Sequence, residues 1–252
     1  MTSQKLILET CLLAGRIMME SGSEVYRVED TMNRIAANAN EPNSISYVTA
    51  TGIFMALRSS QYTLVENVSE RSINLEKVAA VNQLSREFAE KKIDLLTLHN
   101  SLVKIDHETP TFPIWLQILS ASIMSALLML LFGGTWPDFI PTFIVGGLGL
   151  LIKILIKTWV NVRFFDDLFS SFIIGSCAIL LVHFHFAVNA DSIIIGAVMA
   201  LVPGVAITTS FRDILAGHMI SGLARGTEAL MVAASIGVGI AIALNFFGEV
   251  LL

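Results

Sequence analysis

Long apolar runs in the C-terminal half place the strongest constraint on how this chain folds. After Pro113, five stretches of about 20 residues are strongly apolar, and a helix of that length crosses the hydrocarbon core of a bilayer. We therefore expect a mostly α integral membrane protein with five transmembrane helices. The predicted spans are residues 114–132, 139–156, 168–186, 192–211 and 228–247.

Charged residues are concentrated before these runs. Of the 16 Lys and Arg residues, 11 precede Pro113, as do 14 of the 21 Asp and Glu residues. This composition shift predicts a small cytoplasmic α+β domain over residues 1–110 and a five-helix transmembrane domain over residues 111–252. A first apolar stretch, residues 6–19, is too short and too charged to span a membrane.

The N-terminal domain is expected to begin with two helices. Residues 3–20 have the pattern of an amphipathic helix, and Gly22 ends it. Ser23 is placed to cap a second helix over residues 24–38. A domain of about 110 residues is large enough to bury a core of its own.

Strands and two further helices are expected after residue 40. Residues 44–51 and 62–68 are rich in β-branched and aromatic residues, which favours strands. Asn74 and Asp94 each precede a helical pattern, and both side chains are good helix caps. The domain is therefore predicted to mix helices with strands.

Basic residues in the loops of the membrane half indicate its orientation. Lys153, Lys157 and Arg163 flank the loop between predicted spans two and three, and Arg212 and Arg225 flank the loop between spans four and five. The loops on the other side contain neither Lys nor Arg. Because basic loops stay in the cytoplasm, we expect a multi-pass protein of the inner membrane with its N-terminus in the cytoplasm and its C-terminus outside.

The dipeptide Pro203-Gly204 interrupts the fourth run. Proline lacks a backbone donor and clashes with the preceding turn, so nearby carbonyls lose their helical partners. Transporters use such breaks to hold ions and substrates, and a simple proline kink is an equal alternative. The run then ends in polar residues, among them Thr208, Thr209, Ser210, Arg212 and Asp213.

Several kinds of site are not indicated by the sequence. Cys11 and Cys177 lie in different domains, so no disulfide is predicted. No zinc-ligand spacing and no phosphate-binding G-x-x-x-x-G-K-[ST] loop is present. We expect no catalytic residue, metal, cofactor or nucleic-acid partner, and a gradient as the source of energy for any transport.

Two long motifs resemble those of the threonine/serine exporter family. The first is Ser21-Gly-Ser-Glu-Val-Tyr-Arg-Val-Glu-Asp30, continuing to Arg34, and is similar to the family's Gly-x-Glu-x-Tyr-Arg-Val-Glu-Asp signature. The second begins at Leu201-Val-Pro-Gly-Val205 and includes Arg212-Asp213, Ser221-Gly222, Arg225 and Glu228. The order of elements also fits, and the chain looks like the separate larger subunit, of YjjP type.

This resemblance implies a subunit of a secondary exporter that moves small carboxylates out of the cytoplasm. The substrates of the family include threonine and serine, and its split forms include exporters of succinate that work with a smaller five-span subunit. An odd number of spans agrees with such a partner, because a second copy of the membrane domain would be inverted, and inverted repeats enclose many transport sites. A higher oligomer is compatible with this arrangement.

The second motif supplies the predicted substrate-binding residues. Arg212 or Arg225 would bind a substrate carboxylate through a planar pair of donors, and a half-helix after Gly204 would add a positive dipole. Asp213 or Glu228 would bind an ammonium group or carry a proton. Alternatively, both arginines only anchor the topology by pairing with these acids. The full set is Pro203, Gly204, Thr208, Thr209, Arg212, Asp213, Arg225 and Glu228.

The first motif is predicted to gate or to contact another domain. Tyr26, beside a charged helical face, would dock as a gate against the membrane domain or a partner. Local pairing of residues three apart is the plainer explanation of the charged face, and it stabilises by only about 0.2–0.5 kcal/mol per pair. The residues concerned are Glu24, Tyr26, Arg27, Glu29 and Asp30.

Two other functions stay open on the sequence alone. A membrane-anchored cytoplasmic enzyme would use Glu24, Glu29 and His99 as acid–base groups, although nothing supplies a nucleophile or a cofactor loop. A regulatory subunit would bind a ligand in its soluble domain. Activity retained by the isolated residues 1–110 would favour the enzyme over the exporter.

Overall fold

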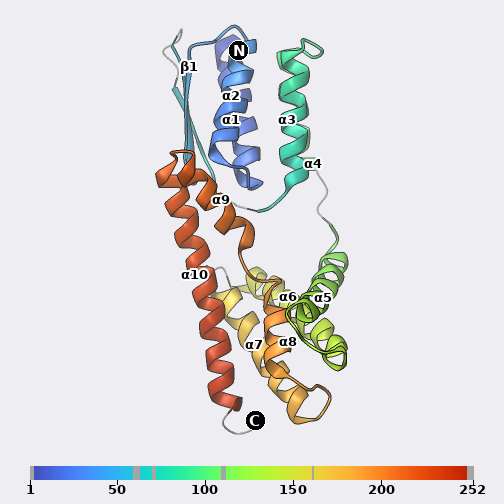
Figure 1. The fold of residues 1–252 in the computed structure, drawn as a ribbon. Coiled ribbons are helices and arrows are strands. Elements are labelled where there is room, and N and C mark those ends of the chain that lie inside the picture. Colours follow the sequence, from blue (N-terminus) through green and yellow to red (C-terminus); the bar gives the residue numbers. More distant parts are fainter. Residues whose placement is uncertain (1–2, 59–62, 70–71, 109–111, 161, 249–252) are drawn as a thin grey trace. The chain divides into compact units, whose positions relative to one another are not determined.

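The computed structural model describes residues 3–58, 63–69, 72–108, 112–160 and 162–248. Its ribbon forms two compact units (Figure 1). The N-terminal unit contains Met1–Pro110 and Val205–Thr227, and the membrane unit contains Thr111–Gly204 and Glu228–Leu252. The sequence suggested a division after residue 110 but gave no sign that Val205–Thr227 groups with the N-terminal residues.

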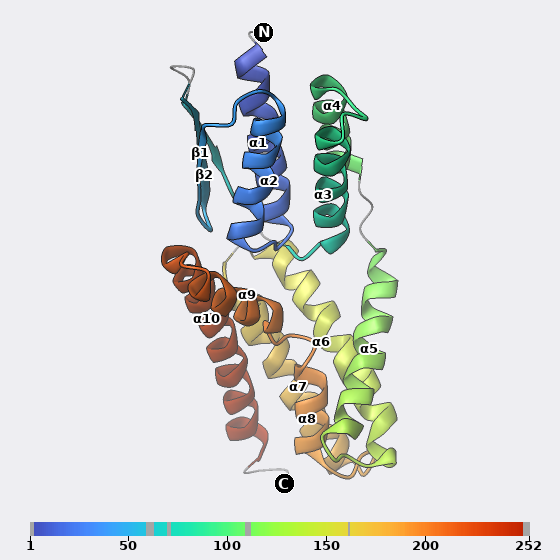
Figure 2. The same cartoon turned by 45° about the horizontal axis from the view of Figure 1, so that its top comes forward.

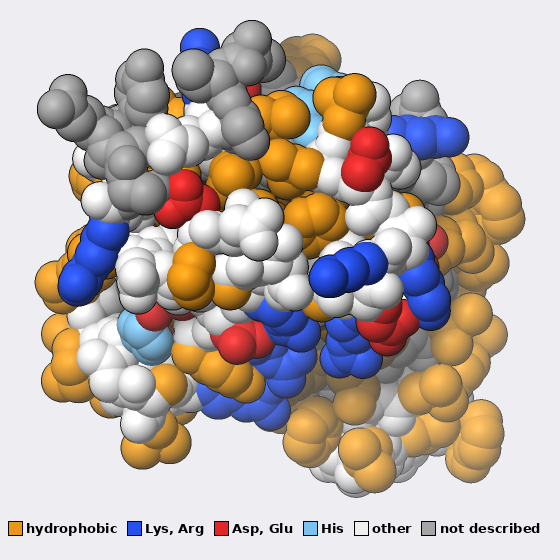
Figure 3. All heavy atoms as spheres, turned by 90° about the horizontal axis from the view of Figure 1, so that it is seen from above, with side chains coloured by type: hydrophobic (Ala, Val, Ile, Leu, Met, Phe, Trp, Pro, Cys, Tyr) orange, Lys and Arg blue, Asp and Glu red, His pale blue; other side chains and the backbone are white. Residues whose placement is uncertain are grey.

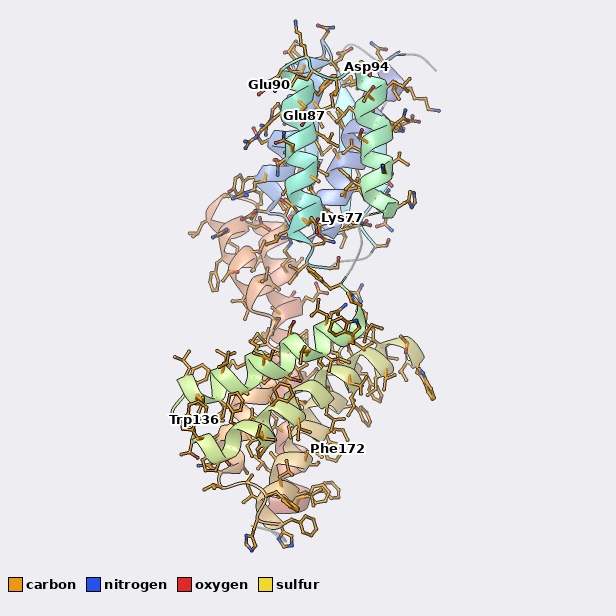
Figure 4. The ribbon with its side chains drawn as sticks, turned by 90° about the vertical axis from the view of Figure 1, so that its right-hand side faces the viewer. Lys77, Glu87, Glu90, Asp94, Trp136 and Phe172 are labelled. Atoms are coloured by element: carbon orange, nitrogen blue, oxygen red, sulfur yellow. The ribbon has the colours of Figure 1, made fainter. Side chains whose placement is uncertain are left out.

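Four helices of the N-terminal unit begin within one residue of their predicted starts, and α4 continues five residues past its predicted end at Val103. Asn74 accepts a hydrogen bond from the Lys77 backbone N–H at 3.1 Å, and Asp94 accepts one from Thr97 at 2.8 Å, so both predicted caps are confirmed. Figure 4 shows Lys77 at one end of the antiparallel α3–α4 pair, with Glu90 and Asp94 at the other. The helices are α1 (Ser3–Glu20), α2 (Val25–Asn38), α3 (Leu75–Ala89) and α4 (Leu95–Glu108).

The predicted cap of α2 is wrong by one residue. Glu24, not Ser23, occupies the cap position, and its side chain makes no capping hydrogen bond. As predicted, the first helix ends before Gly22. Gly22 has a φ of +88°, a conformation that suits glycine. The Val25 backbone N–H at the start of α2 is buried, so it needs an acceptor from elsewhere in the unit.

A three-stranded antiparallel sheet replaces the two predicted strands. β1 (Ser44–Val48) and β3 (Thr63–Asn67) flank β2 (Gly52–Leu57), in the order β1-β2-β3. The strand predicted over residues 44–51 is wrong at its end, because the Thr49 hydroxyl bonds to the backbone of Gly52 and closes a turn. β2 was not predicted, because Gly, Met, Ala and Leu make up most of it and only one of its residues is β-branched.

Helix α1 is the centre of this unit rather than a surface helix with one apolar face. The sheet lies on one side of α1 and α2, and the α3–α4 pair lies on the other (Figures 1 and 2). Charged side chains of both signs spread over the outer face in Figure 3, with apolar groups between them. The buried core includes Leu8, Cys11, Ile17, Met32, Ile53, Leu98 and Leu102.

Four continuous helices in the described part of the chain are long and apolar enough to cross a membrane. They match predicted spans one, two, three and five. They are α5 (Ile114–Leu131), η1 with α6 (Trp136–Asp138 and Phe139–Trp159), α7 (Phe165–His183) and α10 with the π-helical η2 (Met219–Ala243 and Leu244–Gly248).

The fourth predicted span is not one helix. α8 (Ala190–Val198) ends before the break, and α9 (Gly204–Leu215) begins at its glycine. The predicted interruption at Pro203-Gly204 is thus confirmed, but the five-span count is not. A nine-residue helix is about 14 Å long, which is too short to span alone. The break also separates the compact units, since Gly204 belongs to one and Val205 to the other.

Glycines allow the helices of the membrane unit to approach closely. A Cβ added to Gly146 or Gly147 would collide with Ser125 or Ser122 of α5. On the other side of α6, the Ser170 hydroxyl donates to the Gly149 carbonyl at 2.5 Å. Small residues with hydroxyl partners are a common way to pack helices in lipid.

Candidate functional site

Residues from both sequence motifs meet inside the N-terminal unit. Motif one supplies the start of α2, and motif two supplies the end of α9 and the beginning of α10. The turn Ala216–His218 joins α9 to α10, with Gly217 at a φ of +93°. The structure therefore brings together the predicted gating residues and part of the predicted substrate-binding set.

Arg212 contacts the first motif rather than the neighbouring Asp213. Its Nη1 donates to Oε1 of Glu24 at 2.7 Å, while Nε of Arg27 lies 3.1 Å from the other carboxylate oxygen. Partial burial alone would raise the pKa of Glu24. Hydrogen bonds from the backbone and Arg212, with the charge of Arg27, outweigh this effect and hold the pKa below its ordinary value. Glu24 is therefore ionised at neutral pH.

Asp213 satisfies the start of α2. Its Oδ1 accepts a hydrogen bond from the Val25 backbone N–H at 3.0 Å, which supplies the acceptor that the cap residue of α2 lacks. The side chain is fully buried, and its Oδ2 has no hydrogen-bond partner among the described residues. Burial raises the pKa of Asp213 despite the opposing effects of Val25 and Arg225.

Arg225 lies in the second turn of α10 and not at a loop, where the sequence analysis placed it. Its side chain is 8% exposed, and Nη1 is 3.5 Å from Oδ2 of Asp213. Nη2 donates to the backbone carbonyl of Ser23 at 2.9 Å. An arginine that only anchors topology at a membrane surface would be exposed, so Arg225 fits that alternative poorly, although its expected pairing with Asp213 is present.

Close packing holds α9 against α10. The Ser210 hydroxyl donates to the Gly222 carbonyl at 2.6 Å. A Cβ on Gly222 would lie 2.9 Å from the Ser210 carbonyl, and one on Gly226 would lie 2.7 Å from its hydroxyl. This packing fixes the backbone of α9, which carries Arg212, relative to that of α10, which carries Arg225.

Other predicted residues have separate surroundings. Thr208 and Gly204 are exposed, Pro203 is half-buried and Thr209 is 8% exposed. Glu228 lies in α10, in the part that belongs to the membrane unit. The structure does not assemble all eight residues around one point within a single compact unit.

The remaining residues of the first motif contact residues nearby in the sequence, except for Glu29. The Tyr26 hydroxyl accepts a hydrogen bond from Arg27 at 3.1 Å, and Asp30 pairs with Arg34. Glu29 accepts a hydrogen bond from the Val48 backbone N–H at 3.1 Å and so ties α2 to β1. Local pairing therefore accounts for Asp30 and for the contact of Glu24 with Arg27, but not for the contact of Glu24 with Arg212 or of Glu29 with Val48.

Three participants at this site could not be predicted from the sequence. They are His218, 3.9 Å from Glu29, together with Met19 and the Ser23 carbonyl. A lone histidine, a methionine and a backbone carbonyl carry no motif, so no pattern in the sequence marked them. Only Gly217 before His218 hinted at a tight turn.

The residues proposed for an enzyme do not gather. His99 on α4 is hydrogen bonded to Thr10 on α1 at 3.1 Å, and within the described residues it shares no contact with Glu24 or Glu29. The part of the chain that the structure describes contains no group of three or more His, Cys, Asp or Glu residues arranged for a metal.

These features define a multi-pass membrane protein with a separate polar unit and an interrupted helix. Residues 9–247 match the family model described as "Putative threonine/serine exporter". The chain belongs to this threonine/serine exporter family of transport proteins. The match begins within α1, covers both motifs and extends through α10.

Individual relatives agree with the family match. The chain is 22% identical over 95% of its length to a protein of Mycobacterium tuberculosis named "Probable threonine/serine exporter", but it spans only 46% of that protein. It is 22% identical over 97% of its length to the Escherichia coli protein named "Probable succinate transporter subunit YjjP" and spans 96% of it. The corresponding Klebsiella aerogenes protein is 20% identical over 98% of the chain, which spans 96% of that protein. No solved structure matches the chain.

Proposed function

We propose that this chain is a subunit of a secondary exporter that moves small carboxylates out of the cytoplasm. Threonine, serine and a dicarboxylate such as succinate are the candidate substrates. The family match over residues 9–247 carries this proposal. The position of Arg212 supports the proposal. Its partly exposed guanidinium lies in the last turn of the half-helix α9, which follows the Pro203-Gly204 break.

Metabolite measurements test the proposal directly. A strain that lacks this chain should accumulate the transported acid, and restoring the gene should lower its concentration again. Comparing threonine, serine and succinate inside and outside the cells identifies the substrate class. Unchanged concentrations of all three acids, in cells that make each of them in excess, would contradict the proposed function.

The proposal includes a separate, smaller membrane subunit. The chain spans nearly all of proteins named as transporter subunits and about half of the mycobacterial exporter. We expect purified chain in liposomes to show no transport above protein-free liposomes, and co-reconstitution with the smaller subunit to restore it, because a second inverted half completes the path. Robust transport by this chain alone would show that no second subunit is needed.

The orientation proposed from the loop charges has its own test. Glu90 directly after α3 and Val188 between α7 and α8 are both exposed, so cysteine at either position is open to an impermeant thiol reagent. In a background without Cys11 and Cys177, whole cells should label Val188→Cys but not Glu90→Cys. Disrupted cells should label both variants. Equal labelling of both in intact cells would refute an N-terminal unit in the cytoplasm.

A further inference from the structure

The carboxylate of Glu24 lies between two guanidinium groups from distant parts of the sequence. Arg212 Nη1 is 2.7 Å from Oε1, and Arg27 Nε is 3.1 Å from Oε2. Each carboxylate oxygen thus faces a different guanidinium group, Oε1 through a hydrogen bond from Arg212 and Oε2 through an ion pair with Arg27, whose Nε–H donates to the Tyr26 hydroxyl. Guanidinium groups that converge on a carboxylate are a usual means by which proteins bind free carboxylates.

The two arginines are accessible, whereas the carboxylate that they hold is not. The side chains of Arg212 and Arg27 are 65% and 49% exposed, and that of Glu24 is 11% exposed. Ion pairs with an exposed partner are weak because water screens them. A soluble carboxylate can therefore reach both guanidinium groups and compete with Glu24 for them.

We propose that Arg27 and Arg212 form a binding site for a carboxylate of the transported molecule, with Glu24 as its internal occupant. An arriving substrate displaces Glu24 and takes its place between the two arginines. This inference rests on the proposed export function and assigns Arg27, so far a gating residue, to substrate binding. Glu24 then sets the affinity of the site by competing with the substrate.

The charge of the cluster favours a dicarboxylate over an amino acid. Two guanidinium groups and one carboxylate leave a net positive charge, which attracts a dianion more strongly than a zwitterion. The nearby Asp213 is fully buried and already accepts from Val25, so it does not offer an exposed partner for an ammonium group. We therefore choose succinate as the probe and expect threonine to compete weakly with it.

Transport kinetics in inverted membrane vesicles test the role of Glu24. The vesicles come from cells that make the full chain with its smaller subunit, so the cytoplasmic side faces the medium. Glu24→Gln removes the competing charge and keeps the size of the side chain. The KM for succinate uptake should fall roughly two- to fivefold, as expected for loss of one weak ion pair. Arg27→Ala should raise the KM.

A matched variant separates this effect from a general change in charge. Glu90→Gln removes one negative charge at the far end of α3, where Glu90 pairs with Lys92, and should leave the KM unchanged (Figure 4). Glu24→Asp keeps the charge but shortens the side chain, so its KM should lie between wild type and Glu24→Gln. If Glu24→Gln fails to insert in the membrane, the KM of Glu24→Asp tests whether Glu24 competes with the substrate.

The result also separates this inference from the proposed function. If wild-type vesicles accumulate neither succinate nor threonine, the export function itself is wrong. A different result would overturn only the present inference. If wild-type vesicles transport succinate, but both Glu24 variants keep the wild-type KM, Glu24 is only a structural contact. A lower KM for threonine with no change for succinate would likewise overturn the assignment to a dicarboxylate.

Discussion

Arg212→Ala is expected to nearly abolish export while the protein still inserts in the membrane. Hydrogen bonds to charged groups contribute about 1.5–3 kcal/mol, so losing the guanidinium should lower uptake at low substrate concentration by roughly 10- to 100-fold. Most of the Arg212 side chain is exposed, and its ion pair with Glu24 contributes no more than about 1 kcal/mol to folding. The loss should therefore be in transport and not in abundance.

Arg212→Lys distinguishes shape from charge at this position. Lysine keeps the positive charge but lacks the planar pair of donors, so we expect export between that of wild type and Arg212→Ala. Arg163→Ala is the matched control, because Arg163 is an exposed basic residue predicted on the same side of the membrane. If Arg212→Ala inserts normally and exports at the wild-type rate, as Arg163→Ala should, Arg212 only anchors the topology.

Local patterns in the sequence predicted most of the helices. Apolar runs gave α5, α6 and α7 nearly to their ends, and the caps Asn74 and Asp94 marked the starts of α3 and α4. Such signals depend on residues that are neighbours in the chain. For the same reason, Pro203 correctly marked the break before α9.

Contacts between distant residues explain what the sequence did not reveal. Nothing in the sequence near Glu24 indicates that its partner is Arg212, which lies 188 residues away. The acceptor for the start of α2 likewise comes from Asp213 and not from Ser23. Arg225 was predicted beside a loop because the apolar run that defined the fifth span begins at residue 228. It lies within a helix because α10 begins earlier, at Met219.

Arg225→Ala is expected to be the most destabilising single substitution at this site. It would leave the carboxylate of Asp213 fully buried without its cation, and breaking a buried pair from one side costs about 3–5 kcal/mol. The hydrogen bond to the Ser23 carbonyl would be lost as well. We expect a sharp drop in abundance and in the thermal unfolding midpoint of the solubilised chain, with Arg86→Ala on the surface of α3 as the control.

A second substitution should relieve this defect in part. Asp213→Asn removes the uncompensated charge, so the double variant should be more stable than Arg225→Ala alone, and the two effects should not add. Burial raises the pKa of Asp213, so its contribution to stability is fully present below the ordinary carboxyl pKa and is lost as pH rises through the raised value. The defect of Arg225→Ala should accordingly shrink at acidic pH, because protonation neutralises the buried group. Additive effects of the two substitutions, with no dependence on pH, would show that the pair does not act as a buried ion pair and that Arg225 acts mainly through the Ser23 carbonyl.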